Sequence, residues 1–162
     1  MSTARQIDRC GRRAAELITA GDIVLTDQPM ADILLVLLAA LSAEVRVGVR
    51  VVAPDDVTLT PKVCLIVAHA AACDGSISCA ETAAACASHA IAQAVPVYVL
   101  NASGPDPDTR DATALAPCAD EVVLAATCIN AIITDRGIYR PAMLMRHLSD
   151  GDTPLDVIVL QT

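Results

Sequence analysis

The sequence predicts an α/β fold: a Rossmann-like, mostly parallel sheet with helices on both faces. Short runs of branched apolar residues alternate with helical segments, which is the pattern of strand–helix–strand units. The run VCLIVA at residues 63–68 is apolar throughout, as expected of a parallel strand covered on both faces. The 162 residues are 54% hydrophobic and 19% charged, which suits a single packed domain over residues 1–162.

Two helices are expected in the first quarter of the chain. Thr3 and Gln6 have the spacing of a capping box, so we expect an N-terminal helix within residues 1–20. Pro29 stands where a helix can begin, and the apolar residues 30–42 continue that helix. Because this run is shorter than the ~18 residues that cross a bilayer, a buried helix is favoured over a membrane span.

Further strands and helices are expected along the rest of the chain. Branched or alternating apolar residues predict strands, and Ser78 with Glu81 forms a second capping-box pattern, which predicts a helix start. Residues 101–119 are rich in Pro, Asp and Ala and predict an exposed loop. The other expected strands are residues 23–26, 45–53, 95–100, 121–124 and 156–160, and the other expected helices are residues 78–94 and 141–149.

Candidate site residues lie where the predicted strands end, because open α/β sheets bind ligands beyond the carboxyl ends of their strands. Two strands are followed by such residues, and the N–H groups of a helix starting at Ser78 would hold an anion. If the chain is an enzyme, we expect His69 or Asp27 to act as its acid or base. The candidate ligand-binding residues are Thr26, His69, Asp74, Gly75, Ser76 and Ser78.

Each of these residues also has an ordinary structural interpretation. The segment around Asp74 and Gly75 can be a simple turn in a loop between strand and helix. His69 can be a hydrogen-bonded structural histidine, and Asp27 a solvated carboxylate. The residues alone leave both interpretations open.

Charge and composition disfavour several classes of function. The net charge of −8 disfavours direct binding to nucleic acid or to an anionic membrane. Two tyrosines are the only aromatic residues, so stacking platforms for single-stranded nucleic acid are scarce. The densest basic group is either a solvated helix face or a contact for an acidic partner or phosphate. It consists of Arg5, Arg9, Arg12 and Arg13.

Cysteine usage favours a reduced, cytoplasmic protein without a metal. The seven cysteines include no C-x-x-C pair, and the charged, amphipathic N-terminus does not resemble a signal peptide. The three histidines lack zinc-finger spacing, so we expect no metal and no cofactor. The sequence also has no G-x-G-x-x-G, P-loop, G-x-S-x-G or H-E-x-x-H motif, which leaves nucleotide hydrolysis, metalloprotease and esterase activities without support.

Four segments resemble, in order, the motifs of one family, the methylthioribose-1-phosphate isomerases and the alpha, beta and delta regulatory subunits of translation initiation factor two B. The similar segments are GDIVLT at 21–26, LIVAHAAACDGSI at 65–77, VPVYVL at 95–100 and CINAIITDRGIYRP at 128–141. The most specific part is the T-[DE]-x-G turn, here Thr134, Asp135 and Gly137. The resemblance implies the Rossmann-like C-terminal domain of that family and a homo- or hetero-oligomer with related subunits.

The match departs from the isomerases at their catalytic residues. His69 stands at the position of their catalytic Asp, where delta-type subunits have a similar G-A-H. The phosphate-holding N-K-I-G-T segment of the isomerases falls near residues 79–83, which contain no Asn, Lys or Gly. The segment with their catalytic Cys has no counterpart, and the stretch between Pro54 and Lys62 is shortened.

These departures predict a non-catalytic subunit-like protein of the initiation-factor type. It would act in translation initiation or its regulation through protein–protein contacts, and it would sense a phosphorylated metabolite such as a sugar phosphate or nucleotide. The alternative is a divergent aldose–ketose isomerase of the methylthioribose-1-phosphate or ribose-1,5-bisphosphate type, with His69 or Asp27 as its acid or base.

Overall fold

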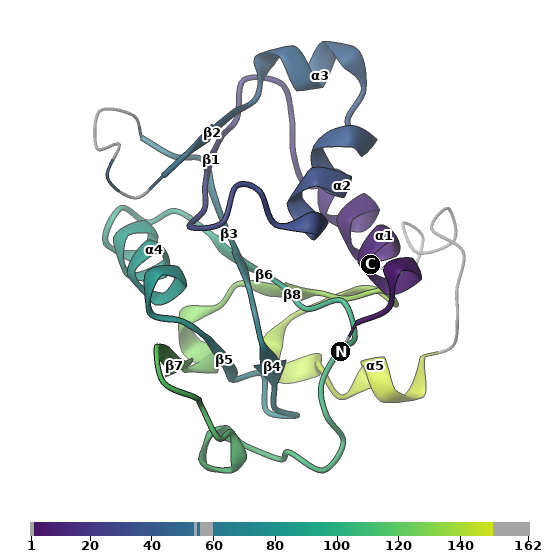
Figure 1. Cartoon of the computed structure of the whole chain (residues 1–162), viewed down its shortest axis with the longest axis vertical. Coiled ribbons are helices and arrows are strands. Elements are labelled where there is room, and N and C mark those ends of the chain that lie inside the picture. Colours follow the sequence, from purple (N-terminus) through teal and green to yellow (C-terminus); the bar gives the residue numbers. More distant parts are fainter. Residues whose placement is uncertain (1, 54, 56–59, 151–162) are drawn as a thin grey trace.

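Two β-sheets and their covering helices make up the chain in the computed structural model, which describes residues 2–53, 55 and 60–150 (Figure 1). The helices are α1 (Ala4–Ala15), α2 (Asp32–Ala40), α3 (Ala43–Gly48), α4 (Glu81–Ala92) and α5 (Arg146–Ser149). The strands are β1 (Ile23–Leu25), β2 (Arg50–Val52), β3 (Val63–Val67), β4 (Ala70–Ala71), β5 (Ile77–Ala80), β6 (Val97–Leu100), β7 (Glu121–Leu124), β8 (Ala131–Ile133) and β9 (Ile138–Tyr139). Short 3-10 turns lie at Ala112–Ala114, Ala126–Cys128 and Pro141–Met143.

The larger sheet has six strands in the order β2-β1-β3-β6-β8-β9. All neighbouring strands pair in parallel except β9, which folds back antiparallel to β8 at the sheet edge. The apolar strand β3 lies in the interior of this sheet, as its sequence predicts. The mostly parallel α/β fold class is therefore confirmed.

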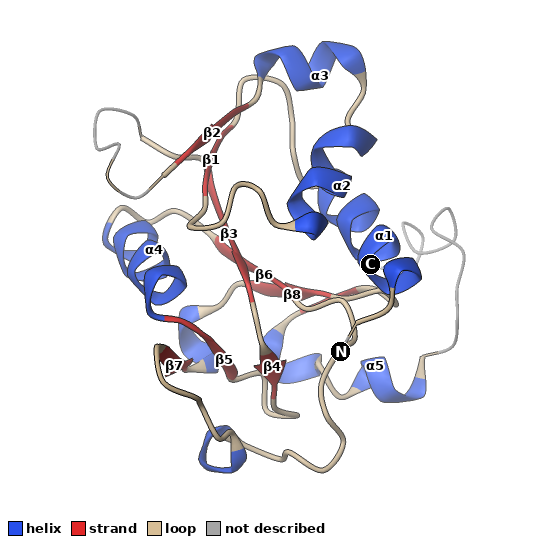
Figure 2. Cartoon of the chain, viewed as in Figure 1, coloured by secondary structure: helices blue, strands red, loops and turns tan. Residues whose placement is uncertain are grey.

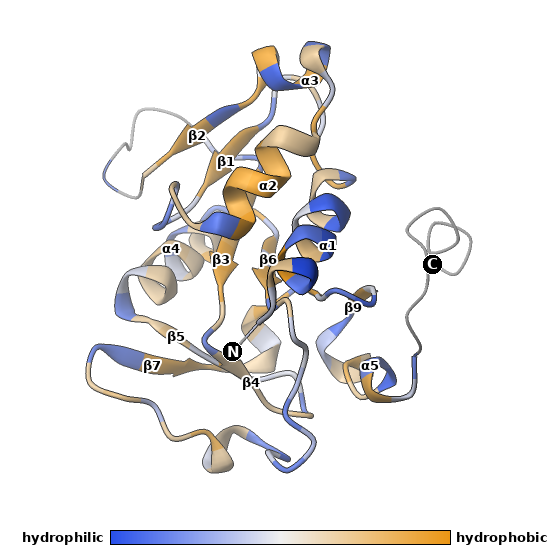
Figure 3. Cartoon of the chain, turned by 45° about the vertical axis from the view of Figure 1, so that its right-hand side comes forward, coloured by the Kyte–Doolittle hydropathy of each residue, from blue (hydrophilic) through white to orange (hydrophobic). Residues whose placement is uncertain are grey.

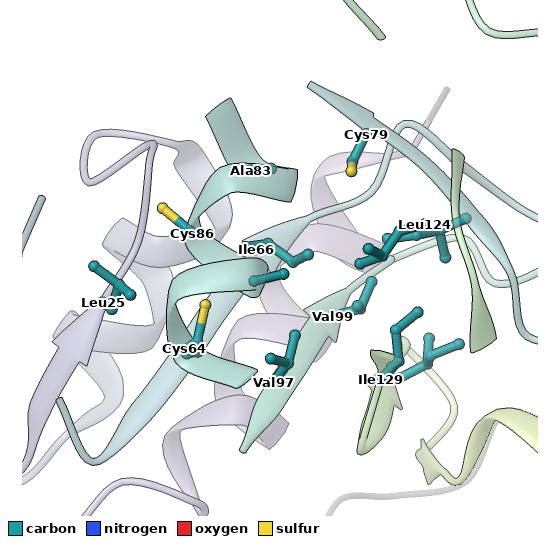
Figure 4. Close-up of a cluster of buried hydrophobic side chains, with 14 of the residues drawn as sticks. Leu25, Cys64, Ile66, Cys79, Ala83, Cys86, Val97, Val99, Leu124 and Ile129 are labelled. Carbon is teal, nitrogen blue, oxygen red and sulfur yellow. The ribbon is translucent and has the colours of Figure 1, made fainter. Parts of the chain in front are cut away.

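Helices cover both faces of the six-stranded sheet (Figure 2). Alternate residues of β3 belong to two different hydrophobic cores. Val63 and Leu65 pack in one core with α1 and α2, while Cys64 and Ile66 pack in the other with α4. Figure 4 shows Ala83 and Cys86 of α4 close to the sheet residues of this second core. Small side chains on α4 allow this close approach, and burial of a side chain as large as Ile66 stabilises the fold by about 1.5–3 kcal/mol.

The N-terminal helix begins as its sequence predicts. The Thr3 side chain accepts a hydrogen bond from the Gln6 N–H, and the Gln6 side chain accepts one from the Thr3 N–H, which completes the capping box. The helix ends at Ala15, before the predicted limit at residue 20. Figure 3 shows α1 as largely hydrophilic and its neighbour α2 as strongly hydrophobic. The apolar α2 packs against α1 and shares a core with sheet residues, while its Leu35 is 42% exposed.

The strand predicted at residues 45–53 is wrong in its first half, where the chain forms α3. Ser42 caps this helix by accepting a hydrogen bond from the Val45 N–H at 3.4 Å. The Arg46 guanidinium then donates to the carbonyl oxygens of Ala39 at 3.1 Å and Leu41 at 2.8 Å, and so ties α3 to the end of α2. A helix of six residues is too short for its periodicity to be told from alternation. The strand β2 occupies the second half.

A three-stranded antiparallel sheet, β4-β5-β7, was not expected. Ser78 lies within β5, so the predicted capping box of Ser78 and Glu81 is wrong. The helix α4 starts at Glu81 after Ala80, which provides no side-chain cap. The strand predicted at residues 121–124 is present as β7, but it pairs with β5 and does not join the parallel sheet.

The remaining predicted elements differ in detail. The helix predicted at 141–149 is broken into a 3-10 turn and the short α5. The strand predicted at residues 156–160 lies outside the described residues. All seven cysteines are free thiols, and the five that are buried act as small apolar core residues. These five are Cys10, Cys64, Cys73, Cys79 and Cys86.

Candidate ligand site at the carboxyl edge of the sheet

Polar residues follow four neighbouring parallel strands and meet at one edge of the sheet. Thr26 and Asp27 follow β1, His69 comes just after β3, Asn101 follows β6 and Thr134 follows β8. The strands are parallel, so their carboxyl ends share this edge. In open α/β sheets this is the edge at which ligands bind.

A cavity of about 220 Å³ opens at the ends of β3 and β6. We call it the carboxyl-edge pocket. The starts of α1 and α2 form its other walls with the apolar side chains of Ile7 and Ile33. Its polar lining side chains are Ser2, Asp32, His69, Asn101 and Ser103. Among the described residues that line it there is no Lys or Arg, so it suits a small ligand without a strong negative charge.

His69 is the predicted site residue that lines this pocket. Its side chain is 45% exposed, and its Nδ1 forms a short contact with the Glu121 Oε2 of β7. The His69 N–H donates to the Ser78 carbonyl at 2.8 Å, which fixes the backbone. The hydrogen bond from His69, followed by one from the Cys118 N–H, holds the pKa of Glu121 below its ordinary value. A carboxylate thus orients the imidazole at the mouth of the pocket.

Asp27, the other candidate acid or base, is held toward α4. The Thr82 hydroxyl donates to its Oδ2 at 2.8 Å, and its buried Oδ1 has no hydrogen-bond partner among the described residues. Burial and then the Asp27 charge raise the pKa of the Cys86 thiol to about 12, so this thiol stays protonated. Asp27 does not line the carboxyl-edge pocket. Of the two candidate acid–base residues, His69 thus lines this pocket and Asp27 does not.

The predicted loop residues 74–76 form the turn between β4 and β5. The Asp74 Oδ1 accepts a hydrogen bond from the Ser76 N–H at 2.9 Å, as in an Asx turn. Gly75 has a φ of +91°, and a Cβ there would lie 2.5 Å from the Pro141 Cβ. This glycine permits close packing on Pro141. The helix N-terminus predicted beside it is absent because Ser78 continues into β5.

The ligand-binding roles of the remaining residues stay predictions. Thr26 is fully buried, and its Oγ1 accepts a hydrogen bond from the Gln28 N–H at 3.3 Å. Ser78 is buried within β5. Neither side chain lines the carboxyl-edge pocket.

Asn101 and Ser103 are pocket residues that the sequence did not indicate. Asn101 directly follows β6 and is 5% exposed, and its Nδ2 donates to the Gly104 carbonyl at 3.2 Å. The rule that selected His69, a polar residue at a strand end, also selects Asn101. The Pro- and Asp-rich loop that follows obscured this position.

The T-D-x-G turn forms a buried polar cluster beside the pocket. The Thr134 Oγ1 lies 2.8 Å from the His147 Nδ1 and accepts hydrogen bonds from the N–H groups of Arg136 and Gly137. Burial lowers the pKa of His147, with the Asp135 charge opposing that shift. These hydrogen bonds therefore hold the turn that follows β8 in one conformation, and the neutral imidazole of His147 takes part in them.

The N-terminal basic group is divided among different environments. Arg13 is 1% exposed, and its guanidinium donates twice to the Asp135 carbonyl, at 2.8 and 3.0 Å. Arg12 pairs with Asp8 on the surface at 3.0 Å. Arg5 and Arg9 line a cavity of about 320 Å³. A common solvated face for all four arginines is therefore wrong, because Arg13 is buried.

Within residues 2–53, 55 and 60–150, no group of three or more His, Cys, Asp or Glu side chains could hold a metal ion. None of the helices in these ranges is long and apolar enough to cross a membrane.

The chain is similar in structure to several solved proteins, although no family model and no curated protein sequence matches it. It resembles 5-methylthioribose 1-phosphate isomerase from Pyrococcus horikoshii OT3 with a TM-score of 0.64 and 14% identity, over 87% of this chain and 57% of that one. It resembles eIF2B beta from Chaetomium thermophilum with a TM-score of 0.66 and 17% identity, over 93% of this chain and 54% of that one.

A third similar structure is the tetrameric eIF2B-beta2-delta2 complex from C. thermophilum, with a TM-score of 0.64 and 16% identity. The match covers 85% of this chain and 57% of that one, so the chain spans a little over half the length of these neighbours. At such identities the likeness concerns the fold. The chain has the fold shared by eIF2B subunits and methylthioribose-1-phosphate isomerase, in agreement with the resemblance of its four sequence segments.

Proposed function

We propose that this chain is a non-catalytic, eIF2B-subunit-like protein that acts in translation initiation or its regulation through protein–protein contacts. Its partners would be related subunits, in a homo- or hetero-oligomer in the cytoplasm, and a small metabolite would act as its ligand. The fold supports this proposal, since similar structures include eIF2B beta and a tetrameric eIF2B complex.

The non-catalytic half of the proposal is supported by the pocket lining, which includes only one of the two candidate acid–base groups, His69. The isomerisation of a sugar phosphate needs a positioned proton shuttle and an anchor for the phosphate. Asp27 is bound by Thr82 outside the carboxyl-edge pocket, while His69 lines the pocket and contacts Glu121. No Lys or Arg lies among the described residues that line this pocket, so the phosphate would lack a cationic anchor there.

A divergent isomerase is the second candidate, and the His69–Glu121 contact favours it. A carboxylate that binds one imidazole nitrogen fixes the ring orientation, and the other nitrogen is then available for proton transfer. In this case His69 alone would act as both acid and base.

Two measurements separate these candidates. The purified chain is used to capture eIF2B subunits in a pull-down, and ketose formation is followed with methylthioribose 1-phosphate and with ribose 1,5-bisphosphate. We expect subunit capture and no ketose. Turnover that is lost in His69→Ala would overturn the non-catalytic proposal, and so would turnover without any subunit capture.

A further inference from the structure

Another cavity lies beside the edge strand β9, away from the carboxyl-edge pocket. It has a volume of about 540 Å³ and follows β9 toward the start of β6. Figure 3 shows β9 and α5 on one side of the molecule, next to α1. We call this cavity the β9 groove and define it by Leu17, Tyr98, Arg136, Ile138, Arg140 and Arg146.

The β9 groove concentrates positive charge on an acidic protein. Three of its lining residues are arginines, in a chain with 11 basic residues and a net charge of −8. Arg140 and Arg146 are exposed, and no carboxylate among the described residues pairs with either guanidinium. Asp150 is the acidic residue among those that line the groove, and its Oδ2 accepts a hydrogen bond from the Tyr139 hydroxyl at 2.6 Å. The local field therefore favours an anion.

The groove also has a fixed cation and an apolar wall. The Arg136 guanidinium donates through one nitrogen to the His147 carbonyl at 2.8 Å, which holds it in place while its other N–H groups stay available. Leu17, Tyr98 and Ile138 are half-buried and supply apolar and aromatic surface. A ligand with a charged end and an apolar or planar end would satisfy both parts.

We propose that the β9 groove binds a phosphorylated small molecule. Its phosphate would lie among Arg136, Arg140 and Arg146, and its organic part would lie against Tyr98. Guanidinium groups bind phosphate oxygens through paired N–H donors, which favours a phosphate over a singly charged anion. The cavity volume falls within the ~300–1,000 Å³ typical of small-molecule sites, and the net charge of −8 disfavours a polyanion such as RNA. The proposal does not depend on assembly with eIF2B subunits.

Calorimetric titration of the full chain tests this site at constant ionic strength. The ligands are AMP, ribose 5-phosphate, inorganic phosphate and adenosine, since adenosine keeps the organic part of AMP and lacks its phosphate. We expect both phosphate esters to bind more tightly than inorganic phosphate, and adenosine to bind weakest. The double variant Arg140→Gln/Arg146→Gln should weaken AMP binding about tenfold or more, because each substitution removes a charged hydrogen-bond donor.

A matched control removes the same charge elsewhere. Arg50→Gln/Arg110→Gln changes two exposed arginines outside the groove and should leave AMP affinity unchanged. Equal losses of AMP affinity in both double variants would indicate general electrostatic attraction and would overturn the proposed site. Loss of binding in His69→Ala, with none in Arg140→Gln/Arg146→Gln, would move the ligand to the carboxyl-edge pocket and also overturn it.

Two other outcomes would contradict the proposal. No binding of any phosphate ester at millimolar concentration would exclude the site. Binding of a phosphoserine peptide without binding of AMP or ribose 5-phosphate would exclude a small-molecule ligand. The pull-down is scored separately, so failure of the groove and failure of subunit capture are distinguishable results.

Discussion

The carboxyl-edge pocket and the β9 groove differ in how the fold builds them. The pocket follows from topology, because parallel strands end together and polar residues such as His69 and Asn101 stand at those ends. The groove forms where the antiparallel β9 ends the sheet and the chain turns into α5. Among the described residues, no Lys or Arg lines the pocket, whereas three arginines line the groove. The topology of the sheet thus places the carboxyl-edge pocket at one edge, whereas the local sequence after β8 places the three arginine side chains in the β9 groove.

One buried residue connects these two regions. The His147 ring lies beside Thr134, at the carboxyl edge of the sheet. The backbone carbonyl of His147 accepts the hydrogen bond that orients the Arg136 guanidinium in the groove. Its ring also leaves no room for a side chain at Gly104, which ends the turn that begins at the pocket residue Asn101. Changes at this contact should therefore affect both cavities.

The largest expected effect comes from Gly104→Ala. Gly104 has a φ of +77°, and a Cβ would overlap the buried His147 ring, so backbone strain and overpacking add to about 3 kcal/mol or more of lost stability. Gly21→Ala is the matched control, with a φ of +88° and no atom within 4 Å of the added Cβ. It should cost about 1 kcal/mol. Urea unfolding of both variants measures the difference in unfolding free energy. Equal losses of stability in the two variants would contradict the close contact between Gly104 and the His147 ring.

A smaller effect is expected from pH. Burial lowers the pKa of His147 below its ordinary 6.5, so the unfolded chain binds this proton more readily than the folded one. The stability that the neutral ring provides is therefore present above pH 6.5 and is lost as the pH falls from there through the folded-state pKa. Unfolding free energies of the native chain and of His147→Gln, measured between pH 7.5 and 5.5, test this. The native chain should lose more stability than the variant, and parallel curves would contradict it.

The smallest expected effect on the fold comes from His69→Ala. Its side chain is 45% exposed, so the unfolding free energy should change little. The pKa of Glu121 should rise toward its ordinary value, because the hydrogen bond from His69 is the main cause that lowers it. Carboxyl NMR titration measures this shift. An unchanged Glu121 pKa would contradict the orientation of His69 at the pocket, whereas AMP binding in the groove should not change in this variant.

The sequence predicted the parallel core because its signals are local. The run at residues 63–68 and the capping box of Thr3 each depend on neighbouring residues, and both are present. The second sheet depends on pairing between β5 and β7, more than 40 residues apart. The run at Ile77–Ala80 has only four residues, which is too short for its pattern to reveal a strand. Ser78 and Glu81 have capping-box spacing, yet pairing with β7 keeps Ser78 extended.

The site was predicted in part for the same reason. His69 follows a clear strand and lines the pocket. The groove brings together Leu17, Tyr98 and the arginines of residues 136–146, which lie far apart in the sequence. No spacing motif links them, so only the folded chain shows that these arginines share one cavity with an aromatic wall.

Amide chemical-shift mapping with AMP tests the contrast between the two cavities most directly. Saturating AMP is expected to shift the resonances of residues 136–140, Arg146 and Tyr98, and to leave His69, Asn101 and Ser103 unchanged. Shifts centred on His69, Asn101 and Ser103 would place the phosphate ester in the carboxyl-edge pocket and contradict the assignment of the anion site to the β9 groove.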